Sequence, residues 1–285
     1  MNLIVHPFFD SRTASYSYVL ANPGSGTCAV IDPVLGYDPA SRAVDTELAD
    51  QLIEFVSANG YIVEWILETN LHADHVSAAR YLKRHFICAQ LGIGARVVEV
   101  QQEVAARFAP NLATDGRQFD RLFRDDERIC LGHTCGRVLH TPGYGPACVT
   151  YVFDQIAFVG DTLRVPSCGT ARTDLPGGDA AALCRSIRRI LTLADETRLL
   201  SRHRGGGAGR EHHYVSTVAE QKRRNAALRD LGNEAAFTER RRHDDQTLGA
   251  PAMLMEALRA NVETGMLAAE RQSARHGGSA PKALA

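Results

Sequence analysis

The chain has 285 residues, of which 45% are hydrophobic and 23% are charged, and its formal net charge is −1. These values are typical of a globular protein with a sizeable core, and a sheet fold with flanking helices can reach this size as one unit. The near-zero net charge gives no reason to expect a nucleic-acid partner or an anionic membrane surface.

The first third of the chain is predicted to hold short strands, a helix and a loop rich in polar residues. Segments rich in β-branched and aromatic residues predict strands over Leu3–Phe9, Tyr16–Ala21, Thr27–Asp32 and Ile62–Leu67. Apolar residues at helical spacing predict a helix over Val44–Asn59. The strand that ends at Leu67 leads into the loop Glu68–His75, and a second helix is expected over about Val76–Arg84.

The middle of the chain alternates short strands with loops. The predicted strands are Ile129–Leu131, Arg137–His140, Val149–Phe153, Ile156–Val159 and Arg198–Ser201, the last of which leads to His203. An amphipathic pattern predicts a helix over Ala180–Leu193.

The last part of the chain is predicted to be wholly helical beyond about Val215. The expected helices are Val215–Leu231, Glu234–Arg242 and Pro251–Asn261. The small and polar residues from Gly265 onward are typical of a disordered tail. We therefore expect one domain over residues 1–265, with its helical part from about 215, and a disordered tail over residues 266–285.

The cysteines and the N-terminus bear on the compartment. Seven cysteines at wide spacing, without a CxxC pair, favour reduced thiols in a cytosolic protein over a disulfide framework. Residues Met1 to Ser11 lack a basic segment followed by an apolar core, and no apolar run approaches the roughly 20 residues of a membrane span. We expect a cytoplasmic protein without membrane contact.

Polar side chains gather where strands are predicted to end. His72, Asp74 and His75 follow one strand, Asp161 follows a second and His203 follows a third. Loops at strand ends let a rigid sheet aim several side chains at one point. Imidazole and carboxylate groups suit Zn, Fe or Mn better than an ion that seeks thiolates. Two histidines alone are more typical of a polar loop without metal, but the five residues together predict a metal site.

The order of these residues resembles a known family. The motifs that carry the resemblance are Ile31-Asp-Pro-Val-Leu35, Leu71-His-Ala-Asp-His75, Thr141-Pro-Gly143, Pro146-Ala-Cys-Val-Thr-Tyr151, Phe158-Val-Gly-Asp-Thr162, Cys168-Gly-Thr-Ala-Arg-Thr-Asp174, Pro176-Gly-Gly-Asp179 and Thr217-Val-Ala-Glu-Gln221. Over about residues 1–265 the chain resembles the metallo-β-lactamase superfamily, and within it the persulfide dioxygenase branch with its bacterial β-lactamase-like hydrolase relatives. The resemblance implies an α/β fold, a four-layer αββα sandwich with a helical C-terminal extension.

The metal ligands that the resemblance implies are only partly present. In the dioxygenase branch, one iron is held by the first His of HxHxDH, by the His after a Pro-Gly turn and by the bridging Asp. Asn70 and Tyr144 stand at the first two positions, and Asp161 stands at the third. Asn is a weak neutral ligand, and Tyr binds Fe(III) well only as a phenolate, so this half should hold Fe(II) poorly. The other half can supply a zinc-like ion with up to four ligands, which are Asp74, His75, Asp161 and His203.

The resemblance also bears on the surroundings of the site. It implies that Arg172, with Asp174, lies beside the cleft, where the guanidinium can hold a substrate carboxylate such as that of glutathione; an ion pair between the two is equally compatible. The family usually has Asp-Tyr after the final His, whereas this chain has the glycine-rich segment Arg204–Arg210, which we interpret as flexible. His140 is expected behind the ligands, and Cys168 beside the cleft.

Three functions remain open. The first is a dioxygenase that uses Fe(II) on a small thiol substrate such as glutathione persulfide, which Asn70 and Tyr144 oppose. The second is a hydrolase of a thioester or lactone that uses Zn(II), with Asp74 as a catalytic residue. The third is a pseudoenzyme, without metal, that binds a thiol metabolite or a partner protein. The branch resemblance also implies a homodimer.

Overall fold

Two groups of strands meet edge to edge in the computed structural model, which describes residues 3–205, 213–268 and 270. The first group holds β1 (Ile4–Asp10), β2 (Ser15–Asn22), β3 (Thr27–Ile31), β6 (Ile62–Leu67), β8 (Gln90–Gly94) and β9 (Arg121–Phe123). The second holds β10 (Glu127–Leu131), β11 (Thr134–His140), β12 (Val149–Phe153), β13 (Ile156–Gly160), β14 (Arg198–Gly205) and β15 (His213–Thr217). The groups join where Ser15 of β2 pairs with His203 of β14.

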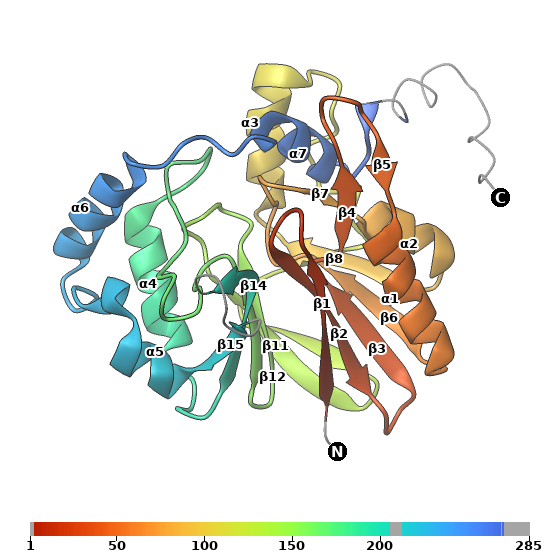
Figure 1. The fold of residues 1–285 in the computed structure, drawn as a ribbon, viewed down its shortest axis with the longest axis horizontal. Helices are drawn as coiled ribbons and strands as arrows, with labels where there is room; N and C mark the ends of the chain where they lie inside the picture. The colour runs from red at the N-terminus through yellow and green to blue at the C-terminus, as the bar shows by residue number, and fades with distance from the viewer. Residues whose placement is uncertain (1–2, 206–212, 269, 271–285) are drawn as a thin grey trace.

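Helices cover the outer faces of both strand groups. On the first group lie α1 (Glu47–Ala58) and α2 (Ala79–His85), and α3 (Val97–Phe108) lies above them in Figure 1. On the second group lies α4 (Ala180–Ile190), against whose outer side α6 (Glu234–Asp245) packs, and α5 (Val218–Arg224) packs against β15. The last helix, α7 (Leu254–Asn261), lies beside α3 (Figure 1). A small sheet of β4 (Val34–Tyr37), β5 (Val44–Asp45) and β7 (Val76–Ser77) completes the fold.

Alternation along the strands creates three apolar layers. In β2, Val19 packs in the core shared with α1 and α2, whereas Tyr18 packs in the core between the two strand groups. This two-residue period is what a strand buried on both faces requires. A third core lies under α4, where Leu183 and Ile187 meet the second strand group. The order helix, sheet, sheet, helix confirms the predicted αββα sandwich.

Local signals explain where the C-terminal helices begin. Asp179 accepts hydrogen bonds from the backbone N–H groups of Ala181 and Ala182 and thereby caps α4. Thr217 and Glu220 form a capping box that starts α5. The prediction of a helix from Val215 was wrong for its first residues, because Val215–Thr217 belong to β15 and pair with β14. The helix predicted from Val76 begins only at Ala79, since Val76 and Ser77 pair with β4.

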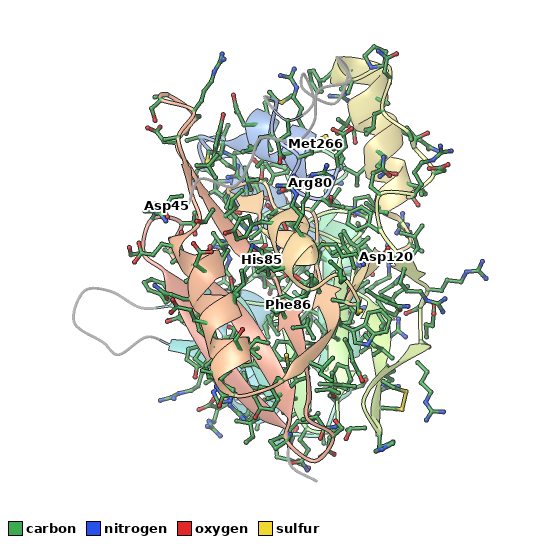
Figure 2. All side chains as sticks on the ribbon, turned by 90° about the vertical axis from the view of Figure 1, so that its right-hand side faces the viewer. Asp45, Arg80, His85, Phe86, Asp120 and Met266 are labelled. Atoms are coloured by element: carbon green, nitrogen blue, oxygen red, sulfur yellow. A yellow bond between two sulfur atoms is a disulfide. The ribbon has the colours of Figure 1, made fainter. Side chains whose placement is uncertain are left out.

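One expectation about the cysteines was also wrong. Cys130 and Cys135 form a disulfide across the β10–β11 hairpin, visible as a yellow bond in Figure 2. The antiparallel register places the two residues directly opposite each other, with their Cα atoms 4.0 Å apart. The hairpin, and not a CxxC spacing, therefore brings the thiols together. The other cysteines are free.

Two further expectations concern segments at the margin of the described chain. The predicted tail lies outside the described residues from residue 271 onward, and so do residues 206–210 of the glycine-rich segment. Among the described residues, no helix is both long and apolar enough to cross a membrane.

Candidate functional site

The loop between β6 and β7 is fixed from two sides. Asp32, which follows β3, accepts hydrogen bonds from the backbone N–H and the hydroxyl of Thr69, both at 2.7 Å. Asn261 of α7 donates its amide N–H groups to the carbonyl oxygens of His72 and His75, both at 2.9 Å. The loop conformation therefore rests on contacts within the chain, and its side chains are presented without the help of a ligand.

Three buried residues behind this loop form what we call the back cluster: Asp32, Glu68 and His72. Nε2 of His72 donates to Asp32 Oδ1 at 3.2 Å and to Glu68 Oε2 at 3.1 Å, and the Ser77 hydroxyl donates to the other oxygen of Glu68. Burial and the Arg202 guanidinium lower the pKa of His72, but the Asp32 and Asp161 carboxylates together outweigh them, so that this pKa lies well above its usual value. Hydrogen bonds to the Asp32 and Glu68 carboxylates therefore engage Nε2 of His72, the ring nitrogen that faces the back cluster.

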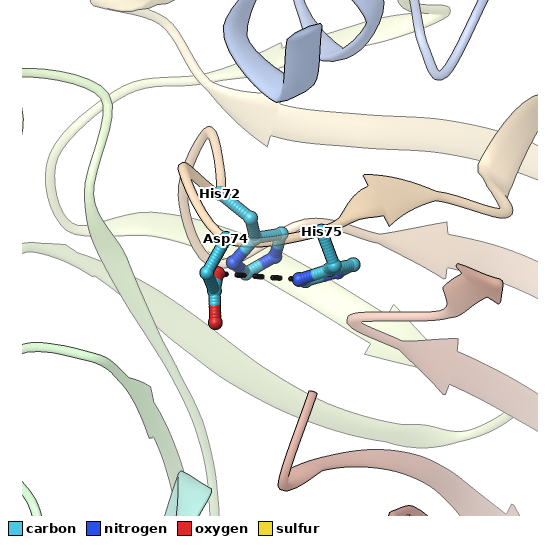
Figure 3. Close-up of side chains that lie close together, drawn as sticks. All are labelled: His72, Asp74 and His75. Carbon is cyan, nitrogen blue, oxygen red and sulfur yellow. Dashed lines mark hydrogen bonds and ion pairs between the residues drawn. The ribbon is translucent and has the colours of Figure 1, made fainter. Parts of the chain in front are cut away.

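The front of the loop carries the predicted metal motif. The ligand atoms of His72, Asp74 and His75 all lie within 4.8 Å of one another, and Figure 3 shows the three side chains converging from one loop. Nδ1 of His72 points forward, 3.7 Å from Oδ2 of Asp161, and has no hydrogen-bond partner among the described residues. These residues are candidate ligands for a divalent metal.

The structure brings the remaining predicted ligands to the same place. Asp161 follows β13, and His203 lies on β14, so the carboxyl ends of two adjacent parallel strands deliver them together. Nε2 of His203 lies 3.0 Å from Asp161 Oδ1 and 3.5 Å from Asp74 Oδ2. All five residues that the sequence singled out as ligands thus converge, although their role as ligands stays a prediction.

Arg202, which the sequence interpretation missed, lies among these residues and is fully buried. Its Nη2 donates to Asp74 at 2.7 and 2.8 Å, and its Nε donates to Asp161 at 3.1 Å. The other contacts of the guanidinium are Nη1 with His75 Nδ1 at 3.1 Å and with Ser15 Oγ at 2.7 Å, and Nη2 with His203 Nε2 at 2.7 Å. We call Arg202 with Asp74, His75, Asp161 and His203 the guanidinium cluster.

An irregularity in β14 explains how Arg202 and His203 reach the same point. Neighbouring side chains of a regular strand point to opposite faces. Pairing between β14 and β15 breaks its register between Leu200 and Gly205, and this interval contains both residues. The distorted strand can therefore turn two consecutive side chains toward one site.

The charges of the guanidinium cluster are complementary. Burial raises the pKa of the Asp74 and Asp161 carboxyls, but the Arg202 guanidinium and the neighbouring histidines together outweigh burial and hold both pKa values well below their usual range. Burial, aided by nearby cationic groups, lowers the pKa of His75 to about 4 and also lowers that of His203. At neutral pH the cluster therefore has two carboxylates and two neutral imidazoles, and their lone pairs face one cation.

The two substituted positions lie beside this cluster. Asn70 donates its amide N–H to Asp161 Oδ2 at 2.8 Å. The Tyr144 hydroxyl is buried and accepts a hydrogen bond from the backbone N–H of Ala73 at 3.2 Å. Burial, followed by the charges of Asp161 and Asp74, raises the pKa of Tyr144 well above its usual value. Tyr144 is therefore a neutral phenol and not the phenolate that binds Fe(III).

The arrangement of the predicted ligand residues does not fit a bound divalent ion. Between Asp74, His75, Asp161 and His203, the position that an ion would take is filled by the Arg202 guanidinium. On the other side, Asn70 turns an N–H donor toward Asp161, and Tyr144 offers only a neutral oxygen. Both positions hold groups that a cation would have to displace.

The predicted substrate contacts form an ion pair. Arg172 donates to both oxygens of Asp174, at 2.7 and 2.6 Å, and to the carbonyl oxygen of Gly249 at 2.9 Å. Its role in substrate binding stays a prediction. His140 donates from Nε2 to the carbonyl of Phe123, and Cys168 is exposed.

A narrow, mostly apolar pocket opens beside Tyr144. Its lining comes from the loop after β6, helix α3, the turn after β11, the segment before α4 and helix α7. It includes Leu71, Ala73, Tyr144, Cys148, Leu175 and Leu254. Burial raises the pKa of Cys148 to about 12, so its thiol stays protonated.

One signal in the sequence could have revealed Arg202. It follows Leu199, Leu200 and Ser201 in a strand that was predicted to lead into the site. A charged residue in a buried strand must be paired, because an isolated buried charge is very costly. Its partners, however, come from distant segments, which spacing along the chain does not reveal.

Comparison with known proteins gives consistent matches. A family model described as the metallo-beta-lactamase superfamily matches residues 11–203. A probable metallo-hydrolase of Burkholderia pseudomallei is 45% identical over 277 residues, which cover 93% of this chain and 94% of that protein. A beta-lactamase hydrolase-like protein of Agrobacterium fabrum is 42% identical over 95% of this chain, which spans only 63% of that longer protein.

More distant matches include persulfide dioxygenases. The mitochondrial persulfide dioxygenase ETHE1 of Bos taurus is 28% identical over 229 residues, which cover 79% of this chain and 76% of that protein. The crystal structure of ETHE1 from Myxococcus xanthus superposes with a TM-score of 0.73 at 26% identity, and covers 92% of this chain and 100% of its own.

Proposed function

Because the chain belongs to the metallo-beta-lactamase superfamily, we propose that it is a member that binds a small thiol metabolite without a metal. One observation supports this above all: Arg202 is hydrogen-bonded to each residue of the more complete set of ligand candidates, which are Asp74, His75, Asp161 and His203. Zinc hydrolases need a metal-bound water, and iron dioxygenases need open positions on the metal. A guanidinium supplies neither, so binding is favoured over both catalytic alternatives.

The ligand class rests on the relatives and on the pocket. Relatives of this chain include persulfide dioxygenases, whose name states a sulfur substrate. The pocket beside Tyr144 is lined mostly by apolar side chains, and its volume of about 20 Å³ has room for little more than one atom of a ligand. Such a pocket suits the terminal sulfur of a thiol or persulfide, which is soft and weakly hydrated, while the polar remainder of a molecule such as glutathione stays outside.

Metal content tests the first half of the proposal. The protein is expressed in medium supplemented with iron and zinc, and its metal content and its O₂ uptake with glutathione persulfide are measured. We expect far less than one metal ion per chain and no O₂ uptake. A stoichiometric metal ion would overturn the proposal, and so would turnover that chelation abolishes.

Ligand binding tests the second half. Calorimetry with glutathione and with glutathione persulfide, with and without EDTA, should show binding that the chelator does not change. Leu254→Trp fills the pocket and should abolish this binding. Leu248→Trp places the same ring at an exposed residue outside the pocket and serves as the matched control. Absence of binding to the wild type, or equal binding by both variants, would contradict the proposed site.

A further inference from the structure

The contacts of Arg202 use the guanidinium completely. A guanidinium has five N–H donors in a fixed planar arrangement. The five residues that accept from Arg202 are Ser15, Asp74, His75, Asp161 and His203. One acceptor residue is therefore present for each donor, and no N–H group is left for a substrate. Arg202 is an internal part of the site and not a group that binds a ligand.

The acceptors come from segments that the fold must hold together. Asp74 and His75 follow β6, Asp161 follows β13, and His203 lies on β14, which meets β2 at the junction of the two strand groups. Ser15, the partner of His203 at this junction, accepts from Nη1. The guanidinium thus joins both halves of the sandwich at the point where β2 and β14 pair through Ser15 and His203.

Several pairs of these acceptors lie as close together as two ligands of one metal ion. Nε2 of His203 lies 3.0 Å from Asp161 Oδ1 and 3.5 Å from Asp74 Oδ2, and His75 Nδ1 lies 3.4 Å from Asp74 Oδ1. Ligands about 2.0–2.1 Å from a tetrahedral zinc ion lie roughly 3.3 Å from one another. Nη2 lies among these atoms, 2.7 Å from both Asp74 Oδ1 and His203 Nε2, and 3.5 Å from Asp161 Oδ1.

We propose that Arg202 replaces the metal as an internal cation, because its guanidinium lies among the residues of a divalent-cation site and all four of these residues are still present. Removal of the guanidinium should open a site for one zinc-like ion, with ligands from Asp74, His75, Asp161 and His203. This inference rests on the proposed function, because it names the residue that makes the protein independent of metal.

The test uses the full chain and Co²⁺ or Zn²⁺ alone as the probe. Wild type, Arg202→Gly and Arg202→Lys are titrated with Co²⁺, whose visible absorption reports coordination by nitrogen and oxygen, and Zn²⁺ stoichiometry is measured by equilibrium dialysis. We expect about one ion for each Arg202→Gly chain and none for the wild type. Arg202→Lys should bind none, because its ammonium keeps a cation at the same place.

A second substitution assigns the ligands. Arg202→Gly/Asp74→Ala should lose the bound ion, whereas Arg202→Gly/Asp174→Ala, which removes a carboxylate outside the cluster, should keep it. If Arg202→Gly does not fold, Arg202→Met provides the same test, and each variant is refolded with and without Co²⁺. Folding that depends on Co²⁺ supports the proposal.

Several results would overturn this inference. They are a folded Arg202→Gly protein that binds no more cation than the wild type, equal binding by the variant that also lacks Asp74, or failure of both single variants to fold even with saturating cation. In these cases a metal-free wild type would leave the proposed function standing. A metal ion in the wild type would instead overturn the proposed function itself.

Discussion

The back cluster and the guanidinium cluster both combine carboxylates with histidines, but they balance the carboxylate charges differently. In the back cluster, the N–H of His72 lies between two carboxylates, and the hydroxyls of Thr69 and Ser77 donate to the remaining oxygens. In the guanidinium cluster, two carboxylates and two neutral imidazole nitrogens face one another as acceptors. Acceptors alone cannot hold together, so this cluster needs a cation, which the chain supplies from Arg202.

The largest effect should follow from removing this cation. Arg202→Met keeps much of the side-chain volume but leaves Asp74 and Asp161 buried without their counter-ion. Loss of one partner from a buried ion pair lowers the free energy of unfolding by about 3–5 kcal/mol. Urea denaturation in the presence of EDTA measures this change.

A matched control separates burial from charge. Arg137 is half exposed, and its guanidinium lies 3.9 Å from Asp126. Arg137→Met should change the free energy of unfolding by less than about 0.5 kcal/mol. Equal effects of the two substitutions would show that the guanidinium cluster contributes no special stability, and the contrast with the back cluster would disappear.

A smaller effect is expected in the back cluster. Glu68→Gln removes the charge that accepts from His72 but leaves an amide that can still bond to Ser77 and to the ring. Hydrogen bonds to charged groups contribute about 1.5–3 kcal/mol. We therefore expect Glu68→Gln to lower the free energy of unfolding by an amount within this range.

Glu99→Gln, at a more exposed position, serves as the control for Glu68→Gln. If Glu68→Gln cost more than Arg202→Met, the stability of the site would reside in the back cluster, contrary to our comparison.

The contrast between the clusters also explains what could be predicted from the sequence. The ligand candidates were found because each follows a strand, and strand ends are visible as pattern changes. Arg202 was missed because its partners lie in segments far apart in the chain and because the distortion of β14 turns it inward. Contacts that tertiary packing alone creates leave no periodic signal.

The same reasoning applies to the fold. Six strands were predicted to within one residue at each end, namely β1, β2, β3, β6, β12 and β13, whereas β8 was not predicted, because its Gly92 and Gly94 resemble turn residues. In the structure these glycines are required by packing. A Cβ on Gly92 would lie 2.6 Å from the Phe123 ring, and one on Gly94 would lie 2.4 Å from the carbonyl oxygen of Ala147. Such close approaches follow from the assembled sheet and not from local sequence.

A modest effect is expected where the guanidinium meets the junction of the strand groups. Ser15→Ala removes the acceptor for Nη1 of Arg202 but leaves the ionic partners intact. A net loss of about 0.5–1.5 kcal/mol follows from one hydrogen bond. A double-mutant cycle with Arg202→Met should give a coupling energy of about 0.5–1.5 kcal/mol, since the two residues are in direct contact. Additive effects would place the stabilising role of Ser15 elsewhere.

The smallest effect is expected outside both clusters, at the pair of Arg172 and Asp174. The side chains are 14% and 35% exposed, so water weakens their attraction. Pairs near the surface contribute about 0.2–1 kcal/mol, and Arg172→Gln should lower the free energy of unfolding by no more than this. Because Asp174 and Gly249 already engage the guanidinium, we also expect Arg172→Gln to bind glutathione as the wild type does. Calorimetry on Arg172→Gln and Asp174→Asn checks both points. A large loss of affinity in Arg172→Gln alone would mean that Arg172 leaves Asp174 to hold the ligand carboxylate, and the recognition site would then extend from the pocket to this ion pair.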